Sequence, residues 1–393
     1  MMAKVLDGIR VLDLGRVLVG PITGMLLADL GAEVVKIEPP DGDQFRSYAP
    51  GFNAVNLNKR SVCLDLRSAL GREALLRLVE GADVLLENFR PGVMARLGLE
   101  VQTLHARNPR LIVCSISGFG ADGPYRTRPA YDTGAMALSG FMSLLVDPER
   151  PAVVGPPIAD GITGMYACYG ILGALYERER TGKGRLVESS MLESLIAFTH
   201  QAFHHYFATG EVQDPITRPR VAQAYVMKCA DGRLIGLHLS TPDKVWKGLL
   251  RAIDSPALAG DSRFSSYEGR VESYEDLAKA LADVFVTRPS PYWMERLHEQ
   301  EVPFAPVYGT DEVLADPQVR NLGSIYEVAQ ADAEPFKAIR RPVRYDGERE
   351  PDAAPPPRLG QHNQRVLADA GFSTVEVAAL TEAGQQPPWP RDG

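Results

Sequence analysis

The sequence contains few cysteines for its length. Its 393 residues include only Cys63, Cys114, Cys168 and Cys229, which lie far apart and form no C-x-x-C pair. This spacing argues against a disulfide framework and against a zinc knuckle. Scattered thiols are typical of proteins in a reducing compartment, so we expect a cytoplasmic protein.

An excess of basic residues is also absent. Lysine and arginine total 42 against 50 acidic residues, which gives a formal net charge of −8. Nonspecific nucleic-acid binding needs a broad basic surface, so we expect no nucleic-acid partner. No apolar run reaches the length of a membrane span, and the first strand-like run, at 9–14, leaves no room ahead of it for a signal peptide. We therefore expect no membrane partner either.

Several common site motifs are missing. Residues 15–20 read GRVLVG rather than G-x-G-x-x-G, no Walker lysine occurs, and Ser115-Ile116-Ser117-Gly118 lacks the leading glycine of a nucleophile elbow. His200 and His204 stand one helical turn apart, but no third ligand follows at an informative spacing. The sequence thus predicts no nicotinamide fingerprint and no metal site.

Short apolar runs alternate with helical patterns through the first half of the chain. Strands are expected at 9–14, 33–38, 61–66, 83–88 and 111–117, and helices at about 21–30, 68–80, 100–107, 132–145, 160–180 and 191–208. Continuous apolar strands joined by helices indicate an α/β fold with a parallel sheet covered on both faces.

The character of the chain changes at the polar, proline-containing segment 211–220, which is typical of a linker. A hairpin follows, with Asp231-Gly232 between runs at 225–229 and 234–239, and then helices at about 242–253, 273–286 and 291–299. A strand at 303–308 and a helix at 363–370 complete the expected elements. We expect three segments: the N-terminal part of a large domain (1–210), a small α+β domain (222–325) and a C-terminal return to the large domain (326–393).

A series of short motifs follows in order along almost the whole chain. These are Gly20-Pro21, LLADLGAEVVKIE (26–38), NKRS (58–61), ENFRPG (87–92), RPAYD (128–132), Asp160 with Thr163-Gly164, TGKG (181–184), PFAPV (303–307), LADP (314–317) and LGQH (359–362). Each is weak alone, but the ordered set is specific. It resembles the class III (CaiB/BaiF-type, formyl-CoA transferase-like) CoA-transferase family.

The resemblance implies an architecture and a set of partners. The large domain would be Rossmann-like and built from both chain ends, with the small domain inserted between them. Two chains would interlock as an obligate homodimer. Acyl-CoA and carboxylic acids would be the substrates, with coenzyme A as a substrate and no tightly bound cofactor.

Asp160 matches the family's nucleophilic aspartate. From the local sequence alone, an aspartate before an apolar helix is most simply a helix cap. The resemblance instead implies a covalent role, in which Asp160 forms an anhydride with the acyl group and then a thioester with CoA.

The resemblance also implies the residues that contact CoA. For the charged members of this set, the alternative is a solvated surface charge. The positions are Val17, Leu18, Asn56, Leu57, Asn58, Lys59, Asn88, Phe89, Arg90, Arg96, Arg128 and Tyr131.

Some positions depart from family members that use formyl-CoA and oxalate. Leu18 replaces a glutamine, Pro39 replaces an arginine, and residues 238–242 (HLSTP) replace a glycine-rich loop. These differences argue against oxalate. Our first expectation is succinyl-CoA as donor and a dicarboxylate such as succinate, mesaconate or citramalate, with Leu18, Arg218, Arg220, His238 and Ser240 as residues that could favour it.

Two other functions stay open at this point. A 2-methylacyl-CoA racemase or epimerase of the same family would need a histidine base, and no histidine occurs from 106 to 199. A non-catalytic CoA-binding protein would have no need for the Asp160 carboxylate.

Overall fold

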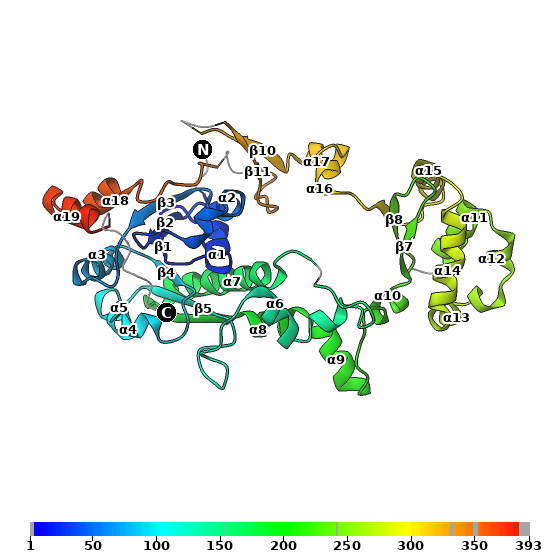
Figure 1. The fold of residues 1–393 in the computed structure, drawn as a ribbon, viewed down its shortest axis with the longest axis horizontal. Coiled ribbons are helices and arrows are strands. Elements are labelled where there is room, and N and C mark those ends of the chain that lie inside the picture. The colour runs from blue at the N-terminus through cyan, green and yellow to red at the C-terminus, as the bar shows by residue number, and fades with distance from the viewer. Residues whose placement is uncertain (1–3, 154, 241–242, 331–333, 349–352, 385–393) are drawn as a thin grey trace. The chain divides into compact units, whose positions relative to one another are not determined.

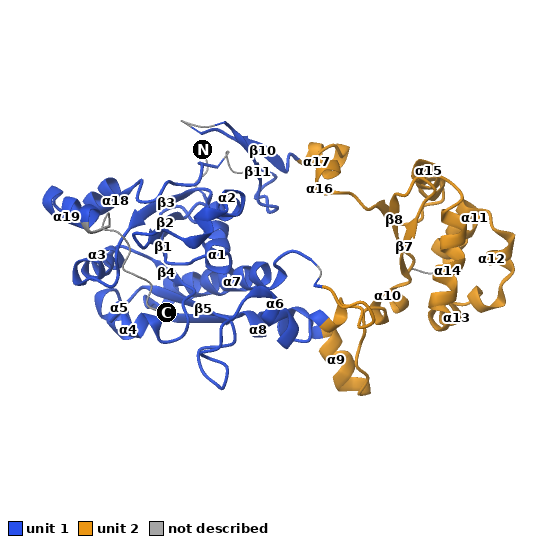
Figure 2. Ribbon diagram, viewed as in Figure 1, with its two compact units in different colours: residues 1–142, 153–200, 323–393 blue, residues 143–152, 201–322 orange. Residues whose placement is uncertain are grey.

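The computed structural model describes residues 4–153, 155–240, 243–330, 334–348 and 353–384. The chain divides into two compact units (Figure 2). Unit 1 comprises residues 1–142, 153–200 and 323–393, and unit 2 comprises 143–152 and 201–322. These limits differ from the predicted 1–210, 222–325 and 326–393, since residues 201–210 have their contacts within unit 2.

A six-stranded parallel sheet forms the centre of unit 1, in the order β3-β2-β1-β4-β5-β6 (Figure 1). The strand order reverses between β1 and β4, and ligands of open α/β sheets bind at such a point, beyond the carboxyl ends of the strands. The strands are β1 (Arg10–Asp13), β2 (Glu33–Glu38), β3 (Lys59–Cys63), β4 (Val84–Glu87), β5 (Ile112–Ser117) and β6 (Leu186–Ser190).

Alternate strand residues enter two separate cores because successive side chains point to opposite faces of a sheet. Val11 and Val84 pack on one face with α1 (Val19–Asp29) and α7 (Ile158–Thr181), whereas Leu12 and Leu85 pack on the other. All four side chains are fully buried. The second face is covered by α3 (Ala69–Glu80), α5 (Val101–Arg107), α18 (Asn363–Asp369) and α19 (Thr374–Gly384).

Helix α7 is long and apolar enough to cross a membrane by length and composition alone, with a mean hydropathy of 1.2 in its most apolar window. The sequence predicts no membrane span. Half of that window is buried within the fold, where Ala167, Ile171 and Ala174 pack against the sheet. These contacts are those of a core helix.

The C-terminal segment of the chain returns to β3. His362 donates its backbone N–H to the Ser61 carbonyl at 3.0 Å, and the Asn363 Oδ1 accepts the Cys63 N–H at 2.8 Å. Gly360 precedes them with a φ of +64°, which glycine adopts without strain. The segment therefore satisfies backbone groups on the outer edge of β3. Before it, β10 (Ile325–Val328) and β11 (Phe336–Ile339) form an antiparallel pair.

Unit 2 contains an antiparallel sheet of β7 (Ala224–Lys228), β8 (Leu234–His238) and β9 (Phe304–Pro306). Gly232 takes a φ of +79° in the turn between β7 and β8. Trp246, Phe285 and Trp293 anchor a core beneath the sheet. Its helices are α9 (His200–Thr209), α10 (Thr217–Ala222), α11 (Asp243–Ile253), α12 (Pro256–Gly260), α13 (Tyr267–Glu272), α14 (Tyr274–Phe285), α15 (Ser290–Glu299), α16 (Thr310–Val313) and α17 (Pro317–Leu322).

The predicted α/β class and its parallel sheet are confirmed. Strand β6 was not predicted, because LVESS is half exposed and lacks the apolar run of the inner strands. The single helix expected at 191–208 is divided into α8 (Met191–Phe198) and α9, with Thr199 between them.

Candidate active site

A pocket of about 470 Å³ lies in unit 1 where β1, β4 and β5 end. The loops that follow these strands form its walls, as expected for the switch point of an α/β sheet. The start of α7 also lines it and contributes Asp160. Eight of the predicted site residues meet here: Val17, Leu18, Asn88, Phe89, Arg90, Arg128, Tyr131 and Asp160.

Asp160 lies in the first turn of α7, and Asp132 caps the same turn. The Asp132 Oδ1 accepts the backbone N–H of Ala159 at 2.7 Å and that of Asp160 at 3.3 Å. Asp160 is thus not the residue that caps α7, so its own carboxylate is available to the pocket. Burial, and then the charge of Asp132, raises the pKa of Asp160 to about 7. Strongly shifted carboxyl groups in clefts are typical of catalytic sites.

Helix α1 begins at the same pocket and packs closely against α7. Thr23 Oγ1 donates to the Gly164 carbonyl at 3.3 Å, and a Cβ on Gly164 would lie 2.7 Å from Ile22 Cγ2. Gly164 therefore permits the close approach of the two helices. Leu18 occupies the N-cap position of α1, and its side chain accepts no hydrogen bond from the backbone N–H groups of the first turn. These N–H groups are therefore available beside the pocket.

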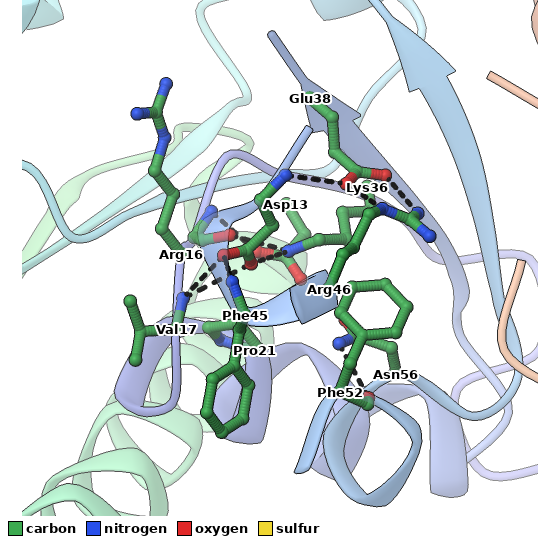
Figure 3. Close-up of polar contacts among 12 residues, drawn as sticks. Asp13, Arg16, Val17, Pro21, Lys36, Glu38, Phe45, Arg46, Phe52 and Asn56 are labelled. Carbon is green, nitrogen blue, oxygen red and sulfur yellow. Dashed lines mark hydrogen bonds and ion pairs between the residues drawn. The ribbon is translucent and has the colours of Figure 1, made fainter. Parts of the chain in front are cut away.

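The loop between β1 and α1 is held in a strained conformation. Val17 has a φ of +64°, which is costly for a β-branched residue. The Asp43 carboxylate accepts the Val17 N–H with both oxygens at 3.2 Å, and the Lys36 Nζ donates to Asp43 at 2.9 Å and to the Gly15 carbonyl at 2.8 Å. Figure 3 shows Val17 and Lys36 in this network.

Asp43 and Lys36 form a fully buried ion pair. Burial alone would raise the pKa of Asp43, but the Lys36 ammonium and the N–H groups of Phe45 and Val17 outweigh it and keep that pKa below its usual value. Asp43 therefore stays ionised and continues to hold Val17. This pair fixes the wall of the pocket that carries Val17 and Leu18.

Asn88 fixes the opposite side of the same loop. Its Oδ1 accepts the Arg16 N–H at 2.8 Å, and its Nδ2 donates to the Arg16 carbonyl at 3.0 Å. The Arg16 guanidinium lies 5.3 Å from the centre of the Phe89 ring. The ends of β1 and β4 are thereby tied together at the pocket.

Arg128 and Tyr131 come from the loop between β5 and α6 (Asp132–Leu138). The Arg128 guanidinium lies over the rings of Phe119 and Tyr125, at 5.9 and 5.3 Å from their centres. Tyr131 is exposed. This loop gives the pocket a cationic and aromatic wall.

The remaining predicted contact residues do not line the pocket. Lys59 and Asn56 are buried, and the Lys59 Nζ donates to Asp13 Oδ2 at 2.8 Å, the Pro21 carbonyl at 2.8 Å and Asn56 Oδ1 at 3.1 Å. Burial lowers the pKa of Lys59 to about 8, although the Asp13 carboxylate opposes this shift. In this structure Lys59 holds α1 against the sheet and is not available to a phosphate.

Leu57, Asn58 and Arg96 lie elsewhere as well. Leu57 packs with Val328 and Ala338, and Asn58 exchanges hydrogen bonds with the backbone of Ala354. Arg96 is exposed at the end of α4 (Val93–Arg96), a few residues beyond Arg90. Only Arg96 is placed to meet a ligand from solvent.

Sequence reasoning assigned no role to Asp132, Asp43 or Lys36. Asp132 belongs to the RPAYD motif and Lys36 to the VVKIE motif, so their positions carried a signal. Asp43 carried none, because only the fold brings it to Val17. Within the residues that the structure describes, no three histidine, cysteine or acidic side chains form a group that could hold a metal ion.

Comparison with known proteins decides the family. The sequence model of CoA-transferase family III matches residues 6–363. The chain belongs to CoA-transferase family III. It is accordingly an enzyme of the transferase class, and members of this family use CoA as a substrate.

Curated relatives of this family III chain match it over most of its length. A succinyl-CoA–D-citramalate CoA-transferase from Chloroflexus aurantiacus is 33% identical over 392 residues, covering 96% of this chain and 97% of the relative. An acetyl-CoA:oxalate CoA-transferase from Acetobacter aceti is 39% identical over 324 residues, covering 79% and 83%.

A solved CaiB/BaiF family protein from Brucella suis has the same fold. Its TM-score against this chain is 0.85 at 31% identity, with 94% of this chain and 100% of that chain covered. The family predicted from the ordered motifs is thus confirmed by sequence and by structure.

Proposed function

We propose that this family III enzyme moves CoA from an acyl-CoA, with succinyl-CoA as the first candidate, to a free dicarboxylic acid, and that Asp160 carries CoA between them. The observation that supports this most is the place of Asp160. It is a carboxylate at the start of α7, lining a pocket at the switch point of the sheet. Asp132 already caps the N-terminus of α7, so the Asp160 carboxylate is not needed as a cap. The pKa of Asp160 is also raised.

The reaction is a sequence of four acyl exchanges. The Asp160 carboxylate attacks the donor thioester, giving an acyl–aspartyl anhydride and the CoA thiolate. The thiolate attacks the aspartyl carbonyl, giving an aspartyl-CoA thioester and the donor acid. The acceptor carboxylate then attacks that thioester, forming a second anhydride, and the thiolate attacks the acceptor carbonyl to release the new acyl-CoA and restore Asp160. Each step exchanges one activated acyl group for another.

The start of α1 can stabilise the oxyanions that form in these steps. Its first-turn N–H groups have no side-chain cap, and Leu18 and Val19 line the same pocket as Asp160. Backbone donors at a helix N-terminus favour negative charge and are already oriented when it develops. The Lys36–Asp43 pair and Asn88 hold this loop in place.

CoA would bind along the cationic and aromatic wall of the pocket. Arg90 and Arg128 line it with Phe89 and Tyr131, and Arg96 lies just beyond. Arginine forks suit phosphates, and aromatic faces suit a purine. Lys59 and Asn56 are left out of this proposal because their polar groups are buried in the fold.

A dicarboxylate is the favoured acid because of the Chloroflexus relative, whose name gives succinyl-CoA and D-citramalate. The Acetobacter relative is named for oxalate, the shortest dicarboxylate. Leu18 lines the pocket of this chain as an apolar side chain, which favours a longer acyl chain than that of oxalate.

We further propose a cytoplasmic, interlocked homodimer. One face of α7 exposes Tyr169 and Tyr176, at 75% and 70% of their surface, and Met165 at 55%. Such an apolar stripe on a long helix is a typical site of subunit contact. Light scattering of the purified chain tests this proposal, and a monomer at micromolar concentration would contradict it.

The racemase alternative finds no support in the pocket. Exchange of an α-proton needs a base on each face of the substrate. Among the described residues that line the pocket there is no histidine, and Asp160 is the one carboxylate.

The role of Asp160 as the carrier of CoA is tested with Asp160→Ala and Asp160→Asn in assays with labelled CoA. We expect loss of transfer by at least about 10³-fold in both variants, with the dimer still folded. Borohydride after incubation with acyl-CoA should reduce one aspartyl thioester, in the peptide that contains Asp160. Appreciable turnover in either variant, or reduction elsewhere, would reject Asp160 as the carrier.

A further inference from the structure

A second pocket, of about 510 Å³, lies entirely within unit 2. It is formed by α9, α10 and the residues that end β8, together with Tyr267 at the start of α13. Its volume is in the range of small-molecule sites. It shares no lining residue with the pocket that contains Asp160. Its polar lining includes Gln201, His205, Thr217, Arg218, His238 and Ser240.

The lining of this pocket favours an anion. Arg218 is exposed, and its guanidinium makes no ion pair or hydrogen bond with any of the described residues. No aspartate or glutamate is among the described lining residues. Two acidic groups contact lining residues from outside: Asp214 Oδ1 lies 2.6 Å from Thr217 Oγ1, and Glu211 Oε2 lies 3.7 Å from the His205 Nε2. An arginine with no internal partner is free to form a bidentate pair with a carboxylate.

The wall that carries Arg218 is fixed by its own hydrogen bonds. The Asp214 Oδ1 accepts the Thr217 N–H and the Thr217 hydroxyl, both at 2.6 Å, and Thr217 Oγ1 accepts the Asp214 N–H at 3.0 Å. At the other end of α10, the Tyr267 hydroxyl donates to the Val221 carbonyl at 2.7 Å. Arg218 therefore extends from a short helix that is tied at both ends.

A second polar group faces the same pocket. The His238 Nε2 and the Ser240 Oγ are 2.7 Å apart, which orients the imidazole. This pair adds a hydrogen-bonding group to the Arg218 charge, and the aliphatic side chains of Val221 and Ala222 also line the pocket. Two polar groups with an apolar wall match a short chain with an anionic group at each end.

We infer that the unit 2 pocket recognises a short dicarboxylate, with Arg218 as its main anchor and His238–Ser240 as the second. The inference rests on the proposed function, because it assigns residues to the acid that such a transferase consumes. A phosphate group of CoA presents similar chemistry to an arginine, so the experiment separates the two sources.

The first measurement follows the histidine Cε1–H resonances of the full-length protein by NMR, with the His238 signal assigned from His238→Gln. Succinate is expected to shift the His238 resonance at concentrations at least about tenfold below those needed for butyrate, which lacks the second carboxylate. Arg218→Met should abolish the difference. Arg288→Met removes an exposed arginine of unit 2 that is outside the pocket lining, and should preserve it.

Three outcomes would overturn the inference. These are no shift with succinate, equal shifts with succinate and butyrate, and a shift with phosphate or adenosine 3′,5′-bisphosphate at lower concentration than with succinate. The last would assign the pocket to the phosphates of CoA instead.

The second measurement is the KM for succinate in the transfer assay. Arg218→Met is expected to raise it about tenfold, with a smaller change in the KM for butyrate. Transfer by the wild-type enzyme with an unchanged succinate KM in Arg218→Met would reject the inference and leave the proposed function intact. Absence of transfer to every acid tested would reject the proposed function, and the NMR comparison would still decide whether the pocket binds dicarboxylates.

Discussion

Asp132 Oδ1 accepts the backbone N–H of Asp160 at 3.3 Å, so two carboxylates share the first turn of α7. A helix N-terminus favours an anion. Burial opposes ionisation of Asp160 and is the largest effect, with the charge of Asp132 adding to it, so that the pKa of Asp160 is about 7. The proposed nucleophile therefore ionises in the middle of the physiological range.

We expect the rate of CoA transfer to fall as the pH decreases through about 7, because only the ionised Asp160 can attack a thioester. Asp132→Asn retains an oxygen that can cap α7 but removes the charge, so the acidic limb should move to lower pH. The single-turnover pH profile checks this, with Asp147→Asn, an exposed carboxylate elsewhere, as control. If the acidic limb stays at the same pH in Asp132→Asn, the charge of Asp132 does not raise the pKa of Asp160.

Asp160→Asn should stabilise the fold at pH 8. The pKa of Asp160 is about 7 in the fold against an ordinary value of 3.8, so stability is lost as the pH rises through that interval. Above pH 7 the folded chain carries a buried charge that asparagine lacks. Urea unfolding should show a gain on the order of 1 kcal/mol at pH 8 that shrinks at pH 5. An equal effect at both values would show that ionisation is not its cause.

Lys36→Met should be strongly destabilising, by about 3–5 kcal/mol, because it leaves the Asp43 carboxylate buried without its cation. In Lys36→Met/Asp43→Asn the amide oxygen can still accept the Val17 N–H and no buried charge remains. The double variant should therefore lose less free energy of unfolding than the two single variants lose together. Urea unfolding of all four proteins completes the cycle, and strictly additive losses would contradict the pairing.

Gly164→Ala should separate α1 from α7 at the pocket. The new Cβ would meet Ile22 Cγ2 at 2.7 Å, and overpacking of this kind costs about 1–3 kcal/mol. We expect lower stability and lower kcat. Gly173→Ala on the same helix meets nothing within 4 Å and is the matched control, expected to be neutral or stabilising by up to about 1 kcal/mol. Equal effects of the two changes would show that the close approach at Gly164 is unimportant.

Periodicity in the sequence predicts the inner part of unit 1 well. The strand at 84–87 is buried on both faces and carries the apolar run Val84-Leu85-Leu86 before Glu87, which leaves a clear local signal. Strand β6 exposes alternate residues at the sheet edge and has no such signal. Helix α19 was also not predicted, although Val377 and Leu380 are buried by residues from distant parts of unit 1.

The site shows a sharper limit of sequence reasoning. Asp160, Asn88 and Tyr131 all come from the ordered motifs and line one pocket, but the motifs do not separate residues that meet a ligand from residues that hold the fold. Lys59 follows Asn58 in a matched motif, and only the structure reveals its buried bond to Asp13, 46 positions away. A charge compensated by a distant partner looks the same in sequence as a charge that awaits a phosphate.

The bonds from His362 and Asn363 to β3 have a consequence for how the chain is made. Ser61 and Cys63 leave the ribosome well before His362 and Asn363, which cover their strand edge, since Cys63 and Asn363 are 300 positions apart. Unit 2 is synthesised in the interval, and its core lies within residues 225–304, so it can close while the first sheet still has an open edge. An open edge invites pairing with another nascent chain. Emergence of His362 and Asn363, rather than of the catalytic half, is thus the event that covers the open edge of unit 1.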